Sequence, residues 1–254
     1  MTLSYIERPN YSVVVVGAAS GIGLAAANFL AAQGAKVACL DSNAAGAVAT
    51  AAAIVGDGRQ AIGLGLDITR DAEIEPALRQ IVDRFGNIDA LVNCAGITGK
   101  TNVPGHQVAI DDFDLVYRIN LRGAFLLSQH VLPFMLQKNY GRLLHVASIA
   151  GKEGNAGMAA YSATKAGLIG LVKSLGKDYA ETGITVNALA PAVIRTPMVA
   201  ALPQATVDYM TAKIPMKRCG DLEEAAQMIA WIVSPACSFT TGFTFDLSGG
   251  RATY

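Results

Sequence analysis

Short apolar runs alternate with amphipathic segments along the whole chain. The first run, Ser12–Val16, is mostly valine, which is typical of a strand buried on both faces of a parallel sheet. Similar runs predict strands at 35–40, 61–66, 89–92, 142–147, 184–189 and 243–247. Helical spacing of apolar residues predicts helices over 22–33, from about 44, over 71–85, over 111–137, around 161–165 and over 221–233. The alternation predicts an α/β fold: a doubly wound seven-stranded parallel sheet in a single domain over residues 1–254.

A glycine-rich turn, Gly17-Ala18-Ala19-Ser20-Gly21-Ile22-Gly23, follows the first predicted strand. Glycines let a chain bend tightly and let backbone N–H groups approach an anion at the start of the next helix, where the helix dipole favours phosphate. An ordinary tight turn is the plainer interpretation. The position between a buried strand and a helix favours a dinucleotide phosphate site.

The second predicted strand is followed by Asp41, about two dozen residues after Gly17. An acid at this place can accept hydrogen bonds from the ribose hydroxyls of an adenosine, and it repels a 2′-phosphate. Ser42 and Asn43 come next, with no arginine beside them. The pattern therefore favours NAD over NADP as cofactor. Asp41 could also cap the helix that begins near Ala44, which is compatible with this role.

Tyr161 and Lys165 stand four residues apart on a predicted helix, so they share one face. An ammonium near a phenol favours the phenolate and lowers its pKa, and such a pair can exchange a proton with an alcohol. Taken alone, the spacing is more typical of a surface tyrosine and a solvated lysine on an amphipathic helix. Asn120 lies near the apolar face of the predicted helix 111–137, where a buried amide needs partners. It is either a satisfied core asparagine or part of a site.

Composition narrows the possible partners. The chain has 254 residues, 52% of them hydrophobic and 16% charged, which is ample for a large core. The formal net charge is zero, so neither a nucleic acid nor a membrane is predicted as a partner. The uncharged stretch Val13–Ala35 has the length of a membrane span, but its glycine turn favours strand, turn and helix.

The cysteines and histidines are scattered, so no metal site is predicted; they are Cys39, Cys94, Cys219, Cys237, His106, His130 and His145. We expect reduced thiols and a cytoplasmic location. The start, Met1–Asn10, has no apolar core and does not look like a signal peptide.

Taken together, the motifs resemble the short-chain dehydrogenase/reductase family over essentially the whole chain. The matching motifs are Gly17-x-x-x-Gly21-x-Gly23, Asp67, Asn93-Cys94-Ala95-Gly96, Asn120, Ser148, Tyr161-x-x-x-Lys165, Pro191 and Thr196. The resemblance implies a Rossmann-type sheet with strand order 3-2-1-4-5-6-7.

The resemblance also implies a catalytic tetrad of Asn120, Ser148, Tyr161 and Lys165. Tyr161 would be the general base for alcohol oxidation and the general acid for ketone reduction. Ser148 would hydrogen-bond the reacting oxygen, and Lys165 would hold the nicotinamide ribose while favouring the tyrosinate. Asn120 would bind a water that leads to Lys165.

The cofactor residues that the resemblance implies are Gly17, Ser20, Gly21, Ile22, Gly23, Asp41, Asp67, Ile68, Asn93, Ala95, Gly96, Tyr161, Lys165, Pro191, Val193, Ile194 and Thr196. The chain departs from the family pattern at two positions. Val16 stands where threonine is common, which removes a side-chain hydrogen bond that braces the glycine turn. Ala192 replaces a glycine, which leaves the backbone there less free. We expect neither change to abolish cofactor binding.

The stretch 148–155 and the ending 248–254 resemble bacterial sugar-acid dehydrogenases of pathways without phosphorylated intermediates, including enzymes that oxidise 2-keto-3-deoxy acids from fucose or rhamnose, and aldose dehydrogenases. We therefore expect NAD-dependent oxidation of a secondary alcohol on a sugar or 2-keto-3-deoxy sugar acid. The candidate substrate contacts are Ser148, Lys152, Glu153, Asn155 and Arg195. A lysine or arginine could bind a carboxylate. Solvated loop residues are the alternative interpretation of these side chains.

Two other functions stay open. The chain also resembles 3-oxoacyl-carrier-protein reductases, but these usually use NADPH, and they carry a basic residue where this chain has Leu126. A non-catalytic NAD-binding scaffold or sensor is disfavoured by the intact tetrad.

A lid and an oligomeric assembly are also expected. The proline-interrupted segment 196–216 could form a small lid over the site. By resemblance, the Asn120 and Tyr161 helices and the last strand would form the faces of a homotetramer. Arg251–Tyr254 could then reach a neighbour's site.

Overall fold

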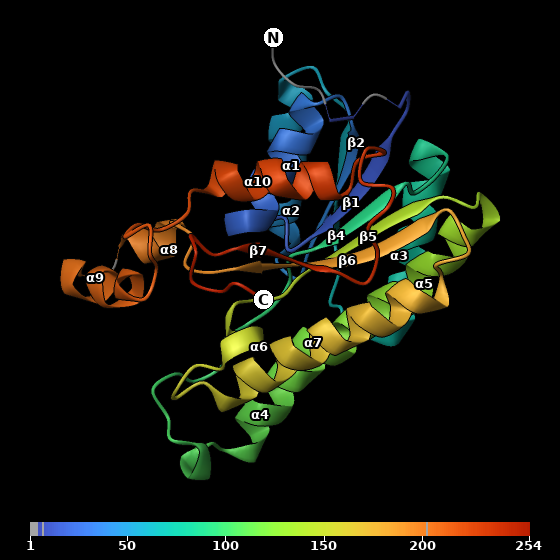
Figure 1. The fold of residues 1–254 in the computed structure, drawn as a ribbon. Coiled ribbons are helices and arrows are strands. Elements are labelled where there is room, and N and C mark those ends of the chain that lie inside the picture. The colour runs from blue at the N-terminus through green and yellow to red at the C-terminus, as the bar shows by residue number, and fades with distance from the viewer. Residues whose placement is uncertain (1–4, 7, 202) are drawn as a thin grey trace.

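Seven parallel strands form one sheet in the computed structural model, which describes residues 5–6, 8–201 and 203–254 (Figure 1). Their order, β3-β2-β1-β4-β5-β6-β7, confirms the expected Rossmann-type topology. The strands are β1 (Ser12–Val16), β2 (Lys36–Asp41), β3 (Ala61–Gly65), β4 (Ala90–Asn93), β5 (Gly141–Val146), β6 (Ile184–Pro191) and β7 (Thr244–Leu247). Part of the stretch expected to lack a signal peptide (residues 1–4 and 7) and residue 202 of the predicted lid lie outside the described residues.

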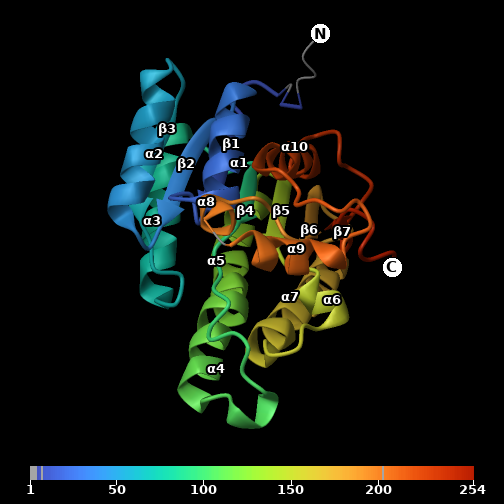
Figure 2. The ribbon, with the colours of Figure 1, turned by 90° about the vertical axis from the view of Figure 1, so that its left-hand side faces the viewer.

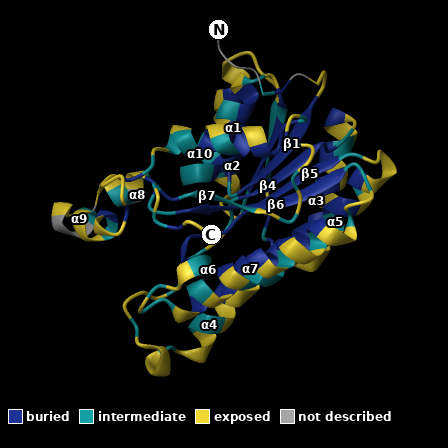
Figure 3. Ribbon diagram, viewed as in Figure 1, coloured by how far each residue is buried: buried dark blue, intermediate teal, exposed yellow. Residues whose placement is uncertain are grey.

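Helices cover both faces of the sheet (Figures 1 and 2). One face carries α1 (Gly21–Ala32), α2 (Ala44–Gly56) and α10 (Leu222–Ile232), and the other carries α3 (Asp71–Phe85), α5 (Ala124–Gln137) and α7 (Ala159–Asp178). Side chains of a strand alternate between faces, so Val13 and Val15 pack toward α1 and Val14 and Val16 toward α3 and α5. Both faces are apolar, and all of β1 is buried, as Figure 3 shows for the central strands.

The prediction of one continuous helix over 111–137 is wrong in detail, because a π-helical turn interrupts the helix. The segment consists of α4 (Ile110–Tyr117), the π turn η2 (Arg118–Gly123) and α5. Asn120 lies in η2, with 1% of its surface exposed. Its Oδ1 accepts from the backbone N–H of Ile97 at 2.9 Å, and its Nδ2 donates to the Ile97 carbonyl at 2.8 Å. The spacing of apolar residues predicts one continuous helix, because it does not register a single wide turn. Such π turns are often found at functional sites.

Short helices complete the chain at and beyond the carboxyl ends of the strands. They are η1 (Gly105–Gln107), α6 (Ala150–Glu153), α8 (Pro197–Ala200) and α9 (Gln204–Ala212). Thr196 begins α8 as its N-cap, and its hydroxyl accepts from the Val199 N–H at 3.3 Å. Among the described residues, no helix is long and apolar enough to cross a membrane.

The sheet positions the site through its connections. β1 lies between β2 and β4, so the chain crosses to one side of β1 and later to the other. In open α/β sheets, ligands bind in the crevice at such a switch point, beyond the carboxyl ends of the strands.

Candidate active site

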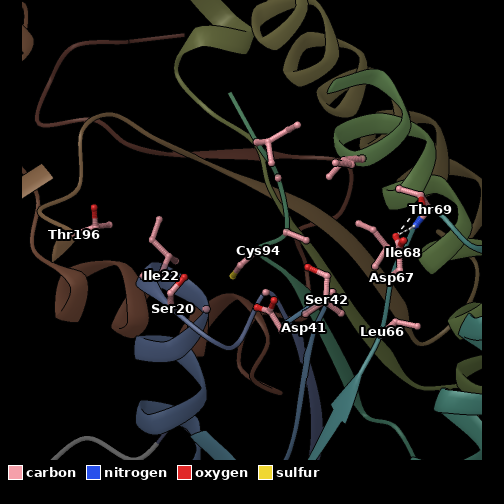
Figure 4. A pocket seen from close by; sticks show the side chains of 18 of the residues that line it. Ser20, Ile22, Asp41, Ser42, Leu66, Asp67, Ile68, Thr69, Cys94 and Thr196 are labelled. Atoms are coloured by element: carbon pink, nitrogen blue, oxygen red, sulfur yellow. Dashed lines mark hydrogen bonds between the residues drawn. The ribbon is translucent and has the colours of Figure 1, made fainter. Parts of the chain in front are cut away.

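A cleft of about 580 Å³ opens at this switch point (Figure 4). The predicted cofactor residues that line it are Gly17, Ser20, Gly21, Ile22, Gly23, Asp41, Asp67, Ile68, Ala95, Gly96 and Thr196. The other lining residues were not among the predicted cofactor contacts; they are Val16, Ser42, Leu66, Thr69, Cys94, Ile97, Leu115 and Ile119. Most of these adjoin a predicted residue at a strand end, which is the signal that could have found them. Leu115 and Ile119 come from α4 and η2, and no motif indicates them.

The glycine turn forms a cradle with no room for side chains inside it. Gly17 has a φ of +82°, and a Cβ there would lie 2.9 Å from the Ala95 nitrogen. A Cβ on Gly23 would overlap the Gly17 carbonyl oxygen. The N–H groups of Gly17 and Ala18 donate to the Leu40 carbonyl at 2.8 and 3.1 Å, so the backbone braces the turn without the threonine that Val16 replaces. The start of α1 therefore fits the pyrophosphate of a dinucleotide.

Asp41 is held at the edge of the cleft by two backbone amides. Its Oδ2 accepts from Ala19 at 3.0 Å and its Oδ1 from Asn43 at 2.9 Å. Each oxygen keeps acceptor capacity for a ribose hydroxyl. Asn43 caps α2 by accepting from Gly46 at 3.1 Å, so the capping role considered for Asp41 belongs to Asn43. None of the described lining residues is a lysine or arginine that could neutralise a 2′-phosphate.

Asp67 follows β3, next to Asp41, since the Leu66 N–H donates to the Asp41 carbonyl at 2.9 Å. Burial raises the pKa of its carboxyl, but hydrogen bonds from the N–H and hydroxyl of Thr69, together with the charge of Arg70, outweigh burial and lower it. Both Thr69 bonds go to Oδ1, at 2.9 and 2.8 Å, and Figure 4 shows the pair. The carboxylate thereby fixes the wall that includes Ile68.

Lys165 and Asn120 meet beside the cleft at Gly96. A Cβ on Gly96 would lie 3.2 Å from Asn120 Oδ1 and 3.2 Å from Lys165 Nζ. Lys165 is only 4% exposed, and its Nζ donates to the Val146 carbonyl at 2.7 Å. Burial lowers the pKa of this ammonium to about 8. Two tetrad positions from separate helical segments thus converge on one glycine of the β4 turn.

Tyr161 lies one turn before Lys165 on α7, with its ring centroid 5.7 Å from Lys165 Nζ. That Lys165 favours the tyrosinate stays a prediction. Burial raises the pKa of Tyr161, and a hydrogen bond with Ser148 is what lowers it. The Lys165 ammonium itself is directed to the Val146 carbonyl. Ser148 Oγ accepts from the Ala150 N–H at 3.1 Å, which holds the serine hydroxyl beside Tyr161.

The remaining predicted cofactor residues lie outside the lining of this cleft. Asn93 is buried at the end of β4, and Pro191 ends β6. Ile194 is buried and bridges to Gly220, while Val193 lines a second cavity of about 330 Å³. Ala192 donates to the Leu247 carbonyl at 2.9 Å with no positive φ, so the alanine fits this loop without strain.

Lys152, a predicted substrate contact, is engaged by the end of the chain. Its Nζ, on a side chain 9% exposed, pairs with Asp246 of β7 at 2.9 Å. Tyr254 donates its hydroxyl to the Lys152 carbonyl at 2.7 Å, and its ring lies 4.9 Å from Nζ. The ammonium is therefore neutralised within the chain.

Glu153 and Asn155 share one guanidinium. Arg251 donates from Nε to Glu153 at 2.9 Å and from Nη2 to Asn155 at 2.9 Å. The segment considered as an arm to a neighbouring subunit is thus docked on its own chain. Arg195, the other predicted substrate cation, is exposed beside Thr196.

A glycine cradle at a switch point, an acid at the end of β2 and a tyrosine and lysine on α7 define a nicotinamide-dependent oxidoreductase. A family model described as enoyl-(acyl carrier protein) reductase matches residues 17–252. The chain belongs to the short-chain dehydrogenase/reductase family.

Relatives of two kinds are similar over nearly the whole chain. The 2-dehydro-3-deoxy-L-rhamnonate dehydrogenase (NAD(+)) of Sphingomonas sp. (strain SKA58) is 46% identical, with 95% of each chain covered. The 3-oxoacyl-[acyl-carrier-protein] reductase of Vibrio cholerae is 38% identical, with 93% of this chain and 95% of that one covered. The crystal structure of a variant of the actinorhodin polyketide ketoreductase with NADPH superposes with a TM-score of 0.90 at 33% identity, covering 96% of this chain and 98% of that one.

Proposed function

We propose that the chain uses NAD to oxidise the secondary alcohol of a 2-keto-3-deoxy sugar acid. The observation that carries the cofactor choice is Asp41, oriented by two amides at a cleft edge whose described lining has no cation. The substrate class rests on the similarity to the Sphingomonas enzyme, whose name specifies 2-dehydro-3-deoxy-L-rhamnonate and NAD(+).

The reaction divides between cofactor and protein. NAD, held by the glycine cradle and Asp41, would supply the hydride acceptor for the carbinol carbon. Tyr161, as phenolate, accepts the hydroxyl proton, while Ser148 donates a hydrogen bond to the same substrate oxygen. Lys165 supplies a buried positive charge near the tyrosine, and Asn120 fixes the Ile97 backbone beside it. Tyr161, Ser148 and Lys165 thus act at the alcohol hydroxyl, and Asn120 acts on the cleft wall at Ile97.

A substrate panel tests the proposal. We expect NADH formation with 2-keto-3-deoxy-L-rhamnonate or its L-fuconate counterpart, and slower formation with neutral aldoses. Turnover confined to acyl thioesters with NADPH would reject the proposed substrate and cofactor together.

A ketoreductase acting on carrier-bound 3-oxoacyl groups is the alternative, favoured by the 38% identity to the Vibrio enzyme. Leu126, where those reductases are expected to carry a basic residue, is 5% exposed and packs into the core, so it offers no cation to a carrier. The non-catalytic scaffold is rejected by any turnover with NAD.

Alcohol oxidation should accelerate as pH rises. Burial raises the pKa of Tyr161, so the phenol is protonated at neutral pH and the phenolate needed for oxidation is scarce. We expect kcat for oxidation to rise up to about tenfold per pH unit above pH 7, because the phenolate fraction rises by that factor below the pKa. The rise should flatten as Lys165, with its pKa lowered to about 8, loses its proton. Rates of NADH formation at saturating substrate and NAD, measured across this range, give the pH profile of kcat. A level profile from about pH 7 to 9 would contradict the role of Tyr161.

Arg195→Met should raise KM for a sugar acid about tenfold, with KM for NAD unchanged. Lys152 and Arg251 are neutralised by Asp246 and Glu153, which leaves Arg195 as the predicted partner of the carboxylate. A neutral aldose is the matched control, since it has no carboxylate to lose. An equal increase in KM for the aldose, or none for the acid, would remove Arg195 from the substrate site.

We also propose that residues 1–254 form one catalytic domain whose segment 196–216 closes over the substrate. Supporting this, Thr196 both lines the cleft and caps α8. A single thermal transition is expected, together with slower amide hydrogen exchange in α9 when NADH and substrate are bound. Unchanged exchange would count against a lid.

A cytoplasmic homotetramer is the proposed working form. Large apolar side chains remain exposed on the α4–α5 face and beside β7, namely Leu115, Tyr117, Phe125, Leu136, Trp231 and Phe243. All four cysteines are free, as in a reducing compartment. Light scattering that shows only monomer would reject the tetramer. Cell fractionation that finds the protein outside the cytoplasm would reject the cytoplasmic location.

A further inference from the structure

A fully buried histidine lies beside the end of β4. His145, on β5, is 0% exposed, and each ring nitrogen meets one polar side chain. Nδ1 lies 3.1 Å from Nδ2 of Asn93, and Nε2 lies 2.9 Å from Oγ of Ser128. These contacts connect α5, through β5, to the end of β4.

The donors available determine where the protons lie. Ser128 has one hydroxyl proton, and it goes to the Ala124 carbonyl at 2.8 Å. The Ser128 oxygen must therefore accept from Nε2–H of His145. Nδ1 then carries a lone pair and accepts from the amide NH₂ of Asn93. The ring is the neutral Nε2–H tautomer.

The surroundings keep this ring neutral. Burial, and then the positive charge of Lys165, lower the pKa of His145 to about 3. A proton on Nδ1 would also face the NH₂ of Asn93, donor against donor. His145 is therefore a fixed acceptor toward Asn93 over the whole range in which the enzyme works.

Asn93 carries this orientation to the cleft. Because its NH₂ is given to His145, its Oδ1 faces the backbone N–H of Ala95, which it accepts at 3.1 Å. Ala95 lines the cleft and packs directly against Gly17 of the glycine cradle. A flipped Asn93 amide would set NH₂ against N–H and push this wall out of place.

We propose that His145 is a positioning residue that fixes the Asn93 amide and thereby holds the Ala95–Gly96 wall of the cofactor cleft. The histidine itself touches neither cofactor nor substrate. The effect of His145 is measured as a change in NADH binding, so the test does not depend on the proposed substrate, although it rests on the proposed cofactor site.

His145→Asn and His145→Gln form a matched pair. The shorter amide reaches the place of Nδ1 and can accept from Asn93, whereas the longer one reaches the place of Nε2 and can donate to Ser128. We expect the NADH dissociation constant to stay within about twofold of the wild-type value for His145→Asn and to rise about tenfold for His145→Gln, the cost of one buried amide without its partner. Fluorescence titration measures both, and a parallel NADPH titration of the wild type shows separately whether the cofactor preference is wrong.

A merely structural histidine would give a different result. Each variant loses one hydrogen bond, so a structural role would lower Tm in both and affect NADH binding equally or not at all. Equal NADH affinity in the two variants overturns the proposal. If His145→Gln does not fold, ¹⁵N NMR of the wild-type ring decides: the neutral Nε2–H pattern is expected, and an Nδ1–H or charged ring overturns it.

Discussion

Tyr161→Phe should lower kcat for alcohol oxidation by about 10²- to 10⁴-fold, the range for loss of a general acid or base. Phenylalanine keeps the buried ring and removes only the oxygen that accepts the substrate proton. NADH affinity and Tm should therefore remain close to those of the wild type. Initial rates of NADH formation and a fluorescence titration of NADH give the two quantities.

Tyr179→Phe is the matched control for this experiment. Tyr179 follows the last turn of the same helix, α7, and its backbone carbonyl, not its phenol, accepts from Thr182. This variant should keep full activity. Unchanged turnover in Tyr161→Phe would show that the proton leaves the alcohol by another route.

Asp41→Ser should lower the preference for NAD over NADP, as a ratio of kcat/KM values, by about 10²-fold or more. Two hydrogen bonds from ribose hydroxyls to a charged acceptor would be weakened, at about 1.5–3 kcal/mol each, and the charge that repels a 2′-phosphate would disappear. Steady-state kinetics with both cofactors measure the ratio.

An acid outside the cleft lining, at the other end of α2 from Asp41, separates this local effect from a change in overall charge. Asp57 follows α2, is exposed and pairs with Arg59 at 3.2 Å. Asp57→Ser should leave the cofactor preference unchanged. A preference for NAD that survives in Asp41→Ser would mean that another group selects the cofactor.

The fold follows from local patterns that tertiary contacts reinforce. The valines of Ser12–Val16 must be covered on both faces, and only a parallel sheet between two helical layers does so. The predicted strand at 142–147 is β5 at Gly141–Val146, a shift of one residue. Strand ends locate the site because Gly17, Asp41 and Asp67 directly follow or end strands that lie side by side.

What the sequence could not provide depends on contacts between distant segments. The π turn at Asn120 is coupled to the backbone of Ile97, 23 positions away, and leaves no trace in apolar spacing. The pairing of Glu153 with Arg251 joins residues 98 positions apart. Spacing predicted that Lys165 lies near Tyr161, but the direction of the ammonium depends on the Val146 carbonyl of β5. The pKa of the phenol depends on how deeply the fold buries it.

The central claim is that this site transfers a hydride from a sugar-acid alcohol to NAD. The most direct measurement compares kcat/KM for NAD-dependent oxidation of 2-keto-3-deoxy-L-rhamnonate with kcat/KM for NADPH-dependent reduction of a 3-oxoacyl thioester, on one preparation. We predict a ratio well above one, with one NADH formed for each acid oxidised. A ratio below one, with no NADH formed from any sugar acid, would contradict the account.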